Sequence, residues 1–468
     1  MKQKLRLNDQ KWRLLLLLAS ILFYGFFTWY DGVVYCTDSP GYIGMDLARE
    51  PLYPLYLAFF RMIFGDGEFY LWAAVLGQGM LSAVAAWSLA GFLTKEFKRN
   101  RFDSVILLLI PLLVSLLCRF AAKRSSMYSN SILSEGVCIP LFLLFARYLL
   151  DYCFHKERKK SLLISAVLSV IVISARKQMM VTLMLLVLAI LFTEMRKQTV
   201  KQTLIRICVY VAAILLLVSG IDRGYNYILR GENVRHSSDD RFLLTVVFYE
   251  SEKEDARQIE EGEVRQLFLD IYESCDEKGY LGHSAEGGWY NRVNHFTDHY
   301  DNIQIDTMWP MIRSYVNSTM QGSEVDREEE IDRIMEIMTR SLLPETKWGI
   351  VRVFMDNVLA GFVITVAKLQ RILVIYAIIA YSIMVALWIV NGKKKGFGSK
   401  ETILFLYTAA SCSINVMVVS AVIFCQTRYM IYNMPLFYMC GYLLLRSGWE
   451  LAIKKSGTKE KGTVKADE

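Results

Sequence analysis

The feature that most constrains this chain is a series of apolar blocks, each about as long as a helix that crosses a lipid bilayer. Ten blocks of roughly 15–25 residues occur, and a membrane-spanning helix needs about 20. Inside a bilayer the backbone must satisfy its own hydrogen bonds, which a helix does. We therefore expect an all-α polytopic membrane protein with about ten transmembrane helices, at residues 14–30, 69–93, 104–118, 132–150, 161–175, 179–193, 203–221, 372–390, 402–425 and 429–445.

Lysine and arginine predict the side on which each loop lies, because cytoplasmic loops carry an excess of both. Five cations precede the first block: Lys2, Lys4, Arg6, Lys11 and Arg13. If the blocks alternate from a cytoplasmic N-terminus, the inner loops are 95–101, 156–160, 196–201, 393–400 and the tail after 446, and each carries several cations. This pattern predicts a multi-pass protein of the cell membrane with both termini in the cytoplasm.

The long polar stretch 222–347 then lies outside the membrane. It holds 14 Lys and Arg against 27 Asp and Glu, a net charge of −13, while the whole chain carries +7, which leaves +20 for the remainder. The basic charge of the chain therefore reflects its inner loops, and we expect no nucleic-acid partner. Charge and Ile or Met alternate at helical spacing in 260–273 and 328–340, so this domain should be mostly helical.

Two further segments are predicted to lie at the membrane surface. Residues 51–64 are apolar and aromatic but too short to cross, which favours an interfacial helix in the first external loop. Residues 348–371 read as an amphipathic interfacial segment. The predicted organisation is a seven-span N-terminal module (1–221), the extracytoplasmic acidic domain (222–347), this segment (348–371), a three-span C-terminal module (372–447) and a polar cytoplasmic tail (448–468).

Cations near the outer ends of the blocks run against the usual charge bias, and they come from three separate loops. Cations of this kind can hold phosphate oxygens, arginine bidentately and lysine as a point charge. For any single residue, contact with ordinary lipid headgroups is the better explanation, but the coincidence of three loops favours a phosphate site. The residues are Arg119, Lys123, Arg124, Arg176, Lys177 and Arg428.

The same predicted face carries acidic residues. Asp38 follows the first block, and Glu135 lies near the outer start of the fourth. A carboxylate that is held near cations is a suitable general base for a hydroxyl group. We prefer turn or capping roles for Asp31 and Asp46, and functional roles for Asp38 and Glu135.

Several types of site are not predicted. The sequence has no Gly-rich nucleotide loop, no nucleophile elbow and no HExxH helix. His295 and His299 are one helical turn apart, but no third ligand motif follows, so a solvated helix face is favoured over a metal site. We expect neither a metal nor a cofactor, and any chemistry should occur at the outer face.

The order of the motifs resembles the GT-C class of membrane glycosyltransferases, in particular the protein O-mannosyltransferase and aminoarabinose transferase group, which has bacterial members. The motifs are Asp38-Ser-Pro-Gly-Tyr42, the segment that contains Arg49 and leads into 51–64, Ser134-Glu135-Gly136, Arg176 between two short blocks, and Gln426-Thr-Arg-Tyr429. The likeness covers about 1–221 and the last two blocks. Better-known members carry Asp-Glu where this chain has Asp38-Ser39, which leaves the subfamily open.

The resemblance implies an inverting glycosyltransferase in a bacterial cell membrane that takes its sugar from a polyprenyl-phosphate donor. Asp38 would act as base on an acceptor hydroxyl, Glu135 would orient a sugar hydroxyl or a cation, and the outer cations would hold the donor phosphate. Tyr42, Arg49 and Tyr429 would line the substrate site. Membrane lipids would surround it, and the acceptor stays open between a cell-envelope glycan, a lipid and a protein.

Two other function classes fit a polytopic chain. A transporter or flippase of a lipid-linked saccharide should carry ionisable residues deep inside several spans, and such residues are almost absent here. A receptor or scaffold that presents the acidic domain would not explain the outer cations or the Asp38 loop. The sequence therefore favours the enzyme.

Overall fold

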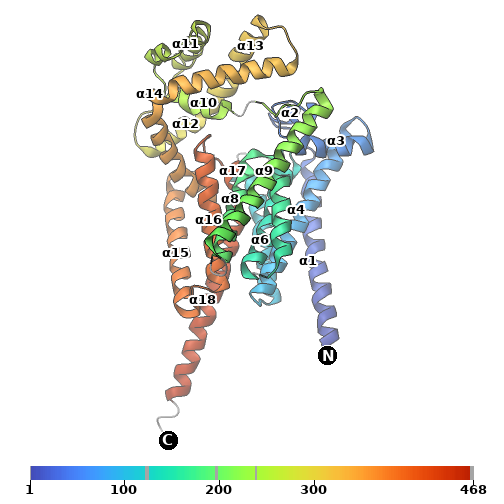
Figure 1. The fold of residues 1–468 in the computed structure, drawn as a ribbon. Helices are drawn as coiled ribbons and strands as arrows, with labels where there is room; N and C mark the ends of the chain where they lie inside the picture. Colours follow the sequence, from blue (N-terminus) through green and yellow to red (C-terminus); the bar gives the residue numbers. More distant parts are fainter. Residues whose placement is uncertain (1, 122–125, 156, 196–198, 238–239, 464–468) are drawn as a thin grey trace.

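The computed structural model describes residues 2–121, 126–155, 157–195, 199–237 and 240–463. In this part of the chain the regular secondary structure is helical, and the only extended pairing is an isolated bridge between Val34 and Ser131. Figure 1 shows a bundle of long helices with a domain of mostly shorter helices at one end and both chain termini at the other. The expected all-α fold class is confirmed.

Among the described residues, nine helices are long and apolar enough to cross a membrane, and eight of them coincide with predicted blocks. Two other predicted blocks are also helical but are not among the nine: α7 (Lys159–Ala175), which has 17 residues, and α18 (Met434–Thr463). The eight are α1 (Lys2–Asp31), α4 (Glu68–Glu96), α5 (Arg101–Ala121), α6 (Glu135–Phe154), α8 (Met180–Glu194, which forms the span Lys177–Glu194 together with the helical turn before it), α9 (Val200–Arg230), α15 (Arg371–Lys395) and α16 (Lys400–Ser420).

The ninth helix, α14 (Glu324–Val366), differs from the prediction. The boundary drawn between 347 and 348 falls inside this one helix, and the boundary after 221 falls inside α9. The last turns of α14 pack on the bundle: a Cβ on Gly361 would lie 2.8 Å from Cγ1 of Val416, and Tyr438 donates a hydrogen bond to the Val366 carbonyl. Residues 348–366 therefore connect the predicted external domain, called the external domain below, to the bundle as part of a continuous helix.

The packing inside the bundle follows from side-chain size. Ala74, Ala83 and Ala86 of α4 are completely buried, and small residues of this kind let helices approach closely within a membrane. In contrast, α9 and α15 expose large apolar side chains such as Leu216 and Ile372, each 73% exposed. Such faces suit contact with lipid, so α4 lies in the interior of the bundle while α9 and α15 lie at its rim.

Helix α3 (Leu52–Phe64) corresponds to the predicted interfacial segment. It buries Tyr53 and Leu57 on one side and exposes Phe59 and Met62 on the other. Tyr56 fixes it to α4 by donating a hydrogen bond of 2.6 Å to the Ala74 carbonyl. An apolar helix with one face packed and the other open is what an interfacial location requires.

The buried core of the external domain includes Phe248, Phe268, Ile334 and Met338, and it continues to Val416 of α16 in the bundle. Its parts nearest the bundle are α10 and α12 (Figure 1). The ring of Tyr300 in α12 lies 5.1 Å from that of Phe424, in the loop after α16, and links the domain to the bundle. The domain consists of α10 (Asp240–Tyr249), η3 (Lys253–Gln258), α11 (Gly262–Asp276), η4 (Gly282–Ser284), α12 (Trp289–Ile303), the π-helical turn η5 (Gln304–Met308), α13 (Trp309–Thr319) and the first half of α14.

Candidate active site

Two loops at the domain end of the bundle bring the motifs of Asp38 and Glu135 together. The Val34 amide donates to the Asn130 carbonyl at 2.9 Å, and the Ile132 amide donates to the Val34 carbonyl at 3.0 Å. The Ser39 hydroxyl, at the start of α2 (Ser39–Gly44), adds a hydrogen bond of 2.8 Å to the Ile132 carbonyl. These contacts fix the Asp38 loop against the segment that precedes α6.

Glu135 is the first residue of α6 and its side chain is completely buried. A carboxylate suits this position because the amino end of a helix carries partial positive charge. Glu135 forms ion pairs with two arginines, Arg176 at 3.0 Å and Arg428. A buried carboxylate needs such partners, because an unpaired charge away from water is very costly.

Arg176 lies in the turn between α7 and α8, where η2 (Lys177–Met179) begins. Besides Glu135, its guanidinium donates hydrogen bonds to the Ser134 hydroxyl at 3.2 Å and to Oε1 of Gln178 at 3.1 Å. The Gln178 amide in turn donates to the Tyr429 carbonyl at 3.0 Å. The turn between the two short helices is thus tied to the segment that carries Arg428.

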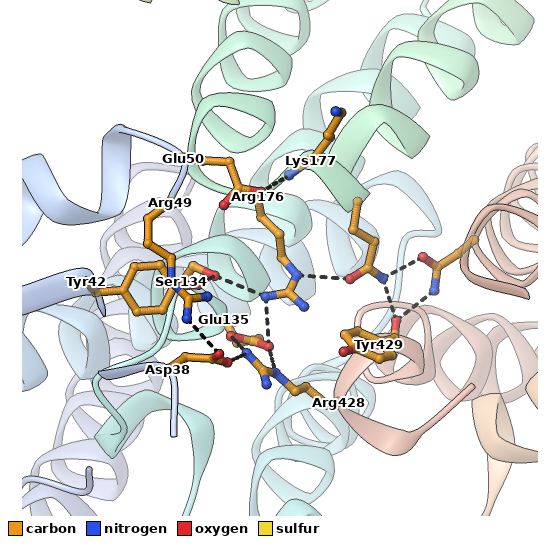
Figure 2. A network of polar contacts seen from close by, with 12 residues as sticks. Asp38, Tyr42, Arg49, Glu50, Ser134, Glu135, Arg176, Lys177, Arg428 and Tyr429 are labelled. Carbon is orange, nitrogen blue, oxygen red and sulfur yellow. Dashed lines mark hydrogen bonds and ion pairs between the residues drawn. The ribbon is translucent and has the colours of Figure 1, made fainter. Parts of the chain in front are cut away.

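Arg428 lies in the single turn α17 (Thr427–Met430) and joins the two carboxylates (Figure 2). Its Nη2 is 2.7 Å from one oxygen of Asp38, whose other oxygen is 3.0 Å from Nη2 of Arg49. The Asp38 side chain is 25% exposed, whereas that of Glu135 is completely buried. Asp38 is therefore the carboxylate of this group that a substrate can reach.

The arginines also set the charge state of Asp38. Burial favours the neutral acid, but the nearby guanidiniums of Arg428 and Arg49 outweigh burial and hold the pKa of the Asp38 carboxyl well below its usual range. Three guanidiniums, of Arg49, Arg176 and Arg428, face the two carboxylates of Asp38 and Glu135. The Glu50 carboxylate lies beside this group (Figure 2). Asp38 is thus ionised in direct contact with two of the guanidiniums.

The predicted aromatic residues border this charged group. The Tyr42 hydroxyl is 3.1 Å from the Ser134 hydroxyl, and Cζ of Arg49 lies 4.8 Å from the centroid of the Tyr42 ring. Cζ of Arg176 lies 5.3 Å from the centroid of Tyr429. Such contacts keep a guanidinium flat against a ring and restrict its orientation.

Of the other predicted phosphate-binding cations, Arg119 does not join this group. Arg119 forms an ion pair with Asp31 at 2.5 Å, and its Cζ lies 5.4 Å from the centroid of Phe27, so it fastens α5 to α1. The Lys177 side chain points away from the arginines in Figure 2, although its backbone amide donates to Oε1 of Glu50 at 2.8 Å. Lys123 and Arg124 lie outside the described residues. Arg119 is therefore a structural residue, because Asp31 neutralises it.

No role was predicted from the sequence for three polar residues that hold the arginines or their neighbours in place. Ser134 and Gln178 bind Arg176 directly. Asn415 of α16 accepts a hydrogen bond from the Gln178 amide at 3.0 Å and donates one to the Tyr429 carbonyl at 2.8 Å. A buried amide in an apolar helix is the one signal that could have drawn attention to Asn415.

One group of acidic and histidine side chains in the described residues has the spacing of a metal site, and it lies far from Asp38 in the bundle. Glu96, Asp151 and His155 offer ligand atoms within 4.8 Å of one another. However, Nζ of Lys400 lies 2.5 Å from Glu96, and Arg158 pairs with Asp151. With a cation on each carboxylate, the group is better explained as an ion-pair network between helix ends.

The two neighbouring histidines of the external domain serve packing. The two ring nitrogens of His295 are 2.9 Å from the Tyr249 hydroxyl and 3.1 Å from the Gly279 carbonyl. The rings of His295 and His299 are 4.5 Å apart, and Tyr280 stacks on His299 at 4.9 Å. Because both nitrogens of His295 have partners, it does not present a free ligand to a metal.

Comparison of the chain with family models, with curated proteins and with solved structures gave no match. The function must therefore be argued from the chemistry of the site itself.

Proposed function

We propose that the chain is a membrane glycosyltransferase that moves a sugar from a polyprenyl-phosphate donor to an acceptor hydroxyl at the outer face of the membrane, with inversion. The observation that carries the proposal is the position of Asp38. This carboxylate is partly exposed and ionised, and it touches arginines from two loops while a third arginine lies on the neighbouring Glu135. A base beside a cluster of guanidiniums suits a reaction in which a proton is removed while a phosphate leaves.

In the proposed reaction the acceptor oxygen attacks the anomeric carbon, and Asp38 takes the hydroxyl proton. The bond between the anomeric carbon and the phosphate oxygen breaks, and its electron pair stays with the lipid phosphate. The negative charge that develops on that phosphate is stabilised by Arg176 and Arg428. A carboxylate has about four acceptor positions, so Asp38 has room for a proton while Arg49 still binds it.

Donor binding would also adjust the strength of the base. A phosphate that takes hydrogen bonds from Arg428 neutralises one of the cations that hold the pKa of the Asp38 carboxyl low. That pKa then rises toward its usual range, which makes Asp38 a stronger base. The same arginines would thus bind the donor and prepare the base.

A transporter for the same lipid would use charged residues along a path through the membrane. Among the described residues, Arg147 of α6 is a cation well inside a span. Its Nε and Nη1 are buried without a hydrogen-bond partner, and its Cζ lies 4.1 Å from the centroid of Tyr148. One such residue does not form a path, whereas the Asp38 group combines acid and cations at one place. These observations favour the transferase.

The test uses the full chain in nanodiscs with radiolabelled polyprenyl-phosphate sugars and membranes that supply the acceptor. We expect Asp38→Asn to abolish measurable transfer while donor binding persists. Replacement of Arg176 or Arg428 by Gln should lower the transfer rate by about 10²–10³, the usual effect of removing one preorganised donor. Asp31→Asn is the matched control, because Asp31 lies at the same end of the bundle but pairs with Arg119. Equal transfer by Asp38→Asn and wild type would end the proposal.

A further inference from the structure

The external domain contributes an arginine that has no anionic partner in the described part of the chain. Arg241 lies at the start of α10, and its buried Nε has no hydrogen-bond partner. The guanidinium instead lies against aromatic rings, with Cζ 5.2 Å from the centroid of Trp309 and 4.9 Å from that of Phe242. A half-buried guanidinium without a carboxylate is costly, and this cost points to an anionic ligand.

Contacts on both sides of Arg241 place it next to the Asp38 group. Four residues earlier, the Ser237 amide donates a hydrogen bond of 3.1 Å to the Leu47 carbonyl, two residues before Arg49. On the other side, the Tyr300 hydroxyl donates to the Phe242 carbonyl at 3.2 Å, and the Tyr300 ring touches Phe424 in the loop that leads to Arg428. Arg241 therefore lies between the Arg49 loop and the Arg428 loop.

The electrostatic coupling agrees with this position. Burial and the nearby charge of Arg49 lower the pKa of Arg241, and Asp38 acts in the opposite direction. In the same part of the domain, burial and the charge of Asp38 raise the pKa of Asp301. The charge of Asp38 thus affects the pKa of two residues of the external domain, Arg241 and Asp301.

We propose that Arg241 forms an oxyanion subsite on the acceptor side of Asp38, so that the acceptor carries a phosphate or carboxylate near the hydroxyl that receives the sugar. This inference rests on the proposed function. The arginines of the Asp38 group already face carboxylates, whereas Arg241 has no carboxylate partner among the described residues, so an anion bound beside Asp38 would supply the partner that Arg241 lacks. Arg241 is a binding residue and takes no part in proton transfer.

The experiment uses inorganic phosphate as the probe, with the full chain in phosphatidylcholine nanodiscs, constant ionic strength and saturating polyprenyl phosphate. Calorimetry should show that wild type binds phosphate without displacing the lipid. Arg241→Gln should weaken this binding about tenfold or more, as expected when a charge-assisted hydrogen bond is lost, and Arg241→Lys should retain part of it. Trp309 fluorescence, identified by its loss in Trp309→Phe, should change with phosphate in wild type and not in Arg241→Gln.

Arg313→Gln is the matched control. Arg313 also lies over Trp309, with Cζ at 5.4 Å from the centroid, but it is already paired with Glu328 at 2.7 Å. This variant should bind phosphate like wild type. Equal phosphate affinity of Arg241→Gln and wild type would overturn the subsite, and so would competition between phosphate and polyprenyl phosphate, which would assign Arg241 to the donor.

Two further measurements distinguish an acceptor subsite from a lipid-binding site, and a failure of the subsite from a failure of the proposed function. If nanodiscs that contain phosphatidylglycerol abolish phosphate binding in wild type, a lipid headgroup occupies the site and the acceptor assignment fails. The transfer assay with Asp38→Asn tests the proposed function independently of Arg241. Transfer that depends on Asp38 but phosphate binding that ignores Arg241 would refute only the subsite, whereas the reverse result would refute the transferase.

Discussion

Removal of the charge of Glu135 should destabilise the protein more than removal of any exposed carboxylate. The Glu135 side chain is completely buried and pairs with both Arg176 and Arg428. Glu135→Gln keeps the size of the side chain but leaves three arginines with Asp38 as their only carboxylate in the group. Loss of one partner from a buried ion pair typically costs about 3–5 kcal/mol. We expect a decrease of this size in the free energy of unfolding.

The assay is denaturation in mixed micelles of dodecyl maltoside and dodecyl sulfate, followed by tryptophan fluorescence. The matched control is Glu329→Gln, because Glu329 is exposed and the same substitution there should change stability by about 0.5 kcal/mol or less. The double variant Glu135→Gln/Arg176→Gln removes one charge of each sign. It should be more stable than the sum of the two single effects predicts, by about 0.5–3 kcal/mol.

Two results would refute this reasoning. A decrease of less than about 1 kcal/mol for Glu135→Gln would mean that water or another group compensates the arginines, since the expected cost of a broken buried pair is several times larger. Strictly additive effects in the double variant would mean that Glu135 and Arg176 do not interact in the folded protein.

Three other predictions follow from the same contacts. Arg49→Gln removes a cation that lowers the pKa of the Asp38 carboxyl, so the acid limb of the pH profile of transfer should shift to higher pH. Wild type should keep Asp38 ionised, and therefore stay active, at lower pH than the variant. An unchanged profile would argue against Asp38 as the base. Arg119→Gln should lower stability but leave the affinity for polyprenyl phosphate unchanged, since Arg119 pairs with Asp31 outside the site. Gly361→Ala places a Cβ 2.8 Å from Val416 and should cost about 1–3 kcal/mol in mixed-micelle unfolding, while Gly220→Ala, with open space around it, should not.

The apolar blocks made the helical fold accessible from the sequence because a bilayer imposes a simple rule. A segment in lipid must be helical and about 20 residues long, whatever its neighbours are. The boundaries of the external domain were harder to predict from the sequence. In α14 the composition changes from charged to apolar near Lys347, but the helix continues to Val366 because helix formation needs no constant polarity.

For the candidate site, too, some features could be predicted from the sequence and others could not. Asp38, Glu135, Arg176 and Arg428 could be selected from the sequence because charges near the outer ends of apolar blocks need a reason. Arg119 satisfied the same criterion, yet it pairs with Asp31. Sequence position alone cannot separate these cases, since both kinds of arginine lie near a span end and differ only in which carboxylate is within reach.

The sequence by itself determined that the chain is helical, that it is built for a membrane, and which charged residues lie near the ends of its apolar blocks. Only the tertiary structure decided the pairing of those charges: it places Arg428 between Asp38 and Glu135, and it leaves Arg241 beside them without a carboxylate partner among the residues it describes. The physical reason is the distance along the chain between the residues that determine each feature. Burial and helix formation depend on nearby residues, whereas an ion pair depends on a few ångströms between residues that are hundreds of positions apart.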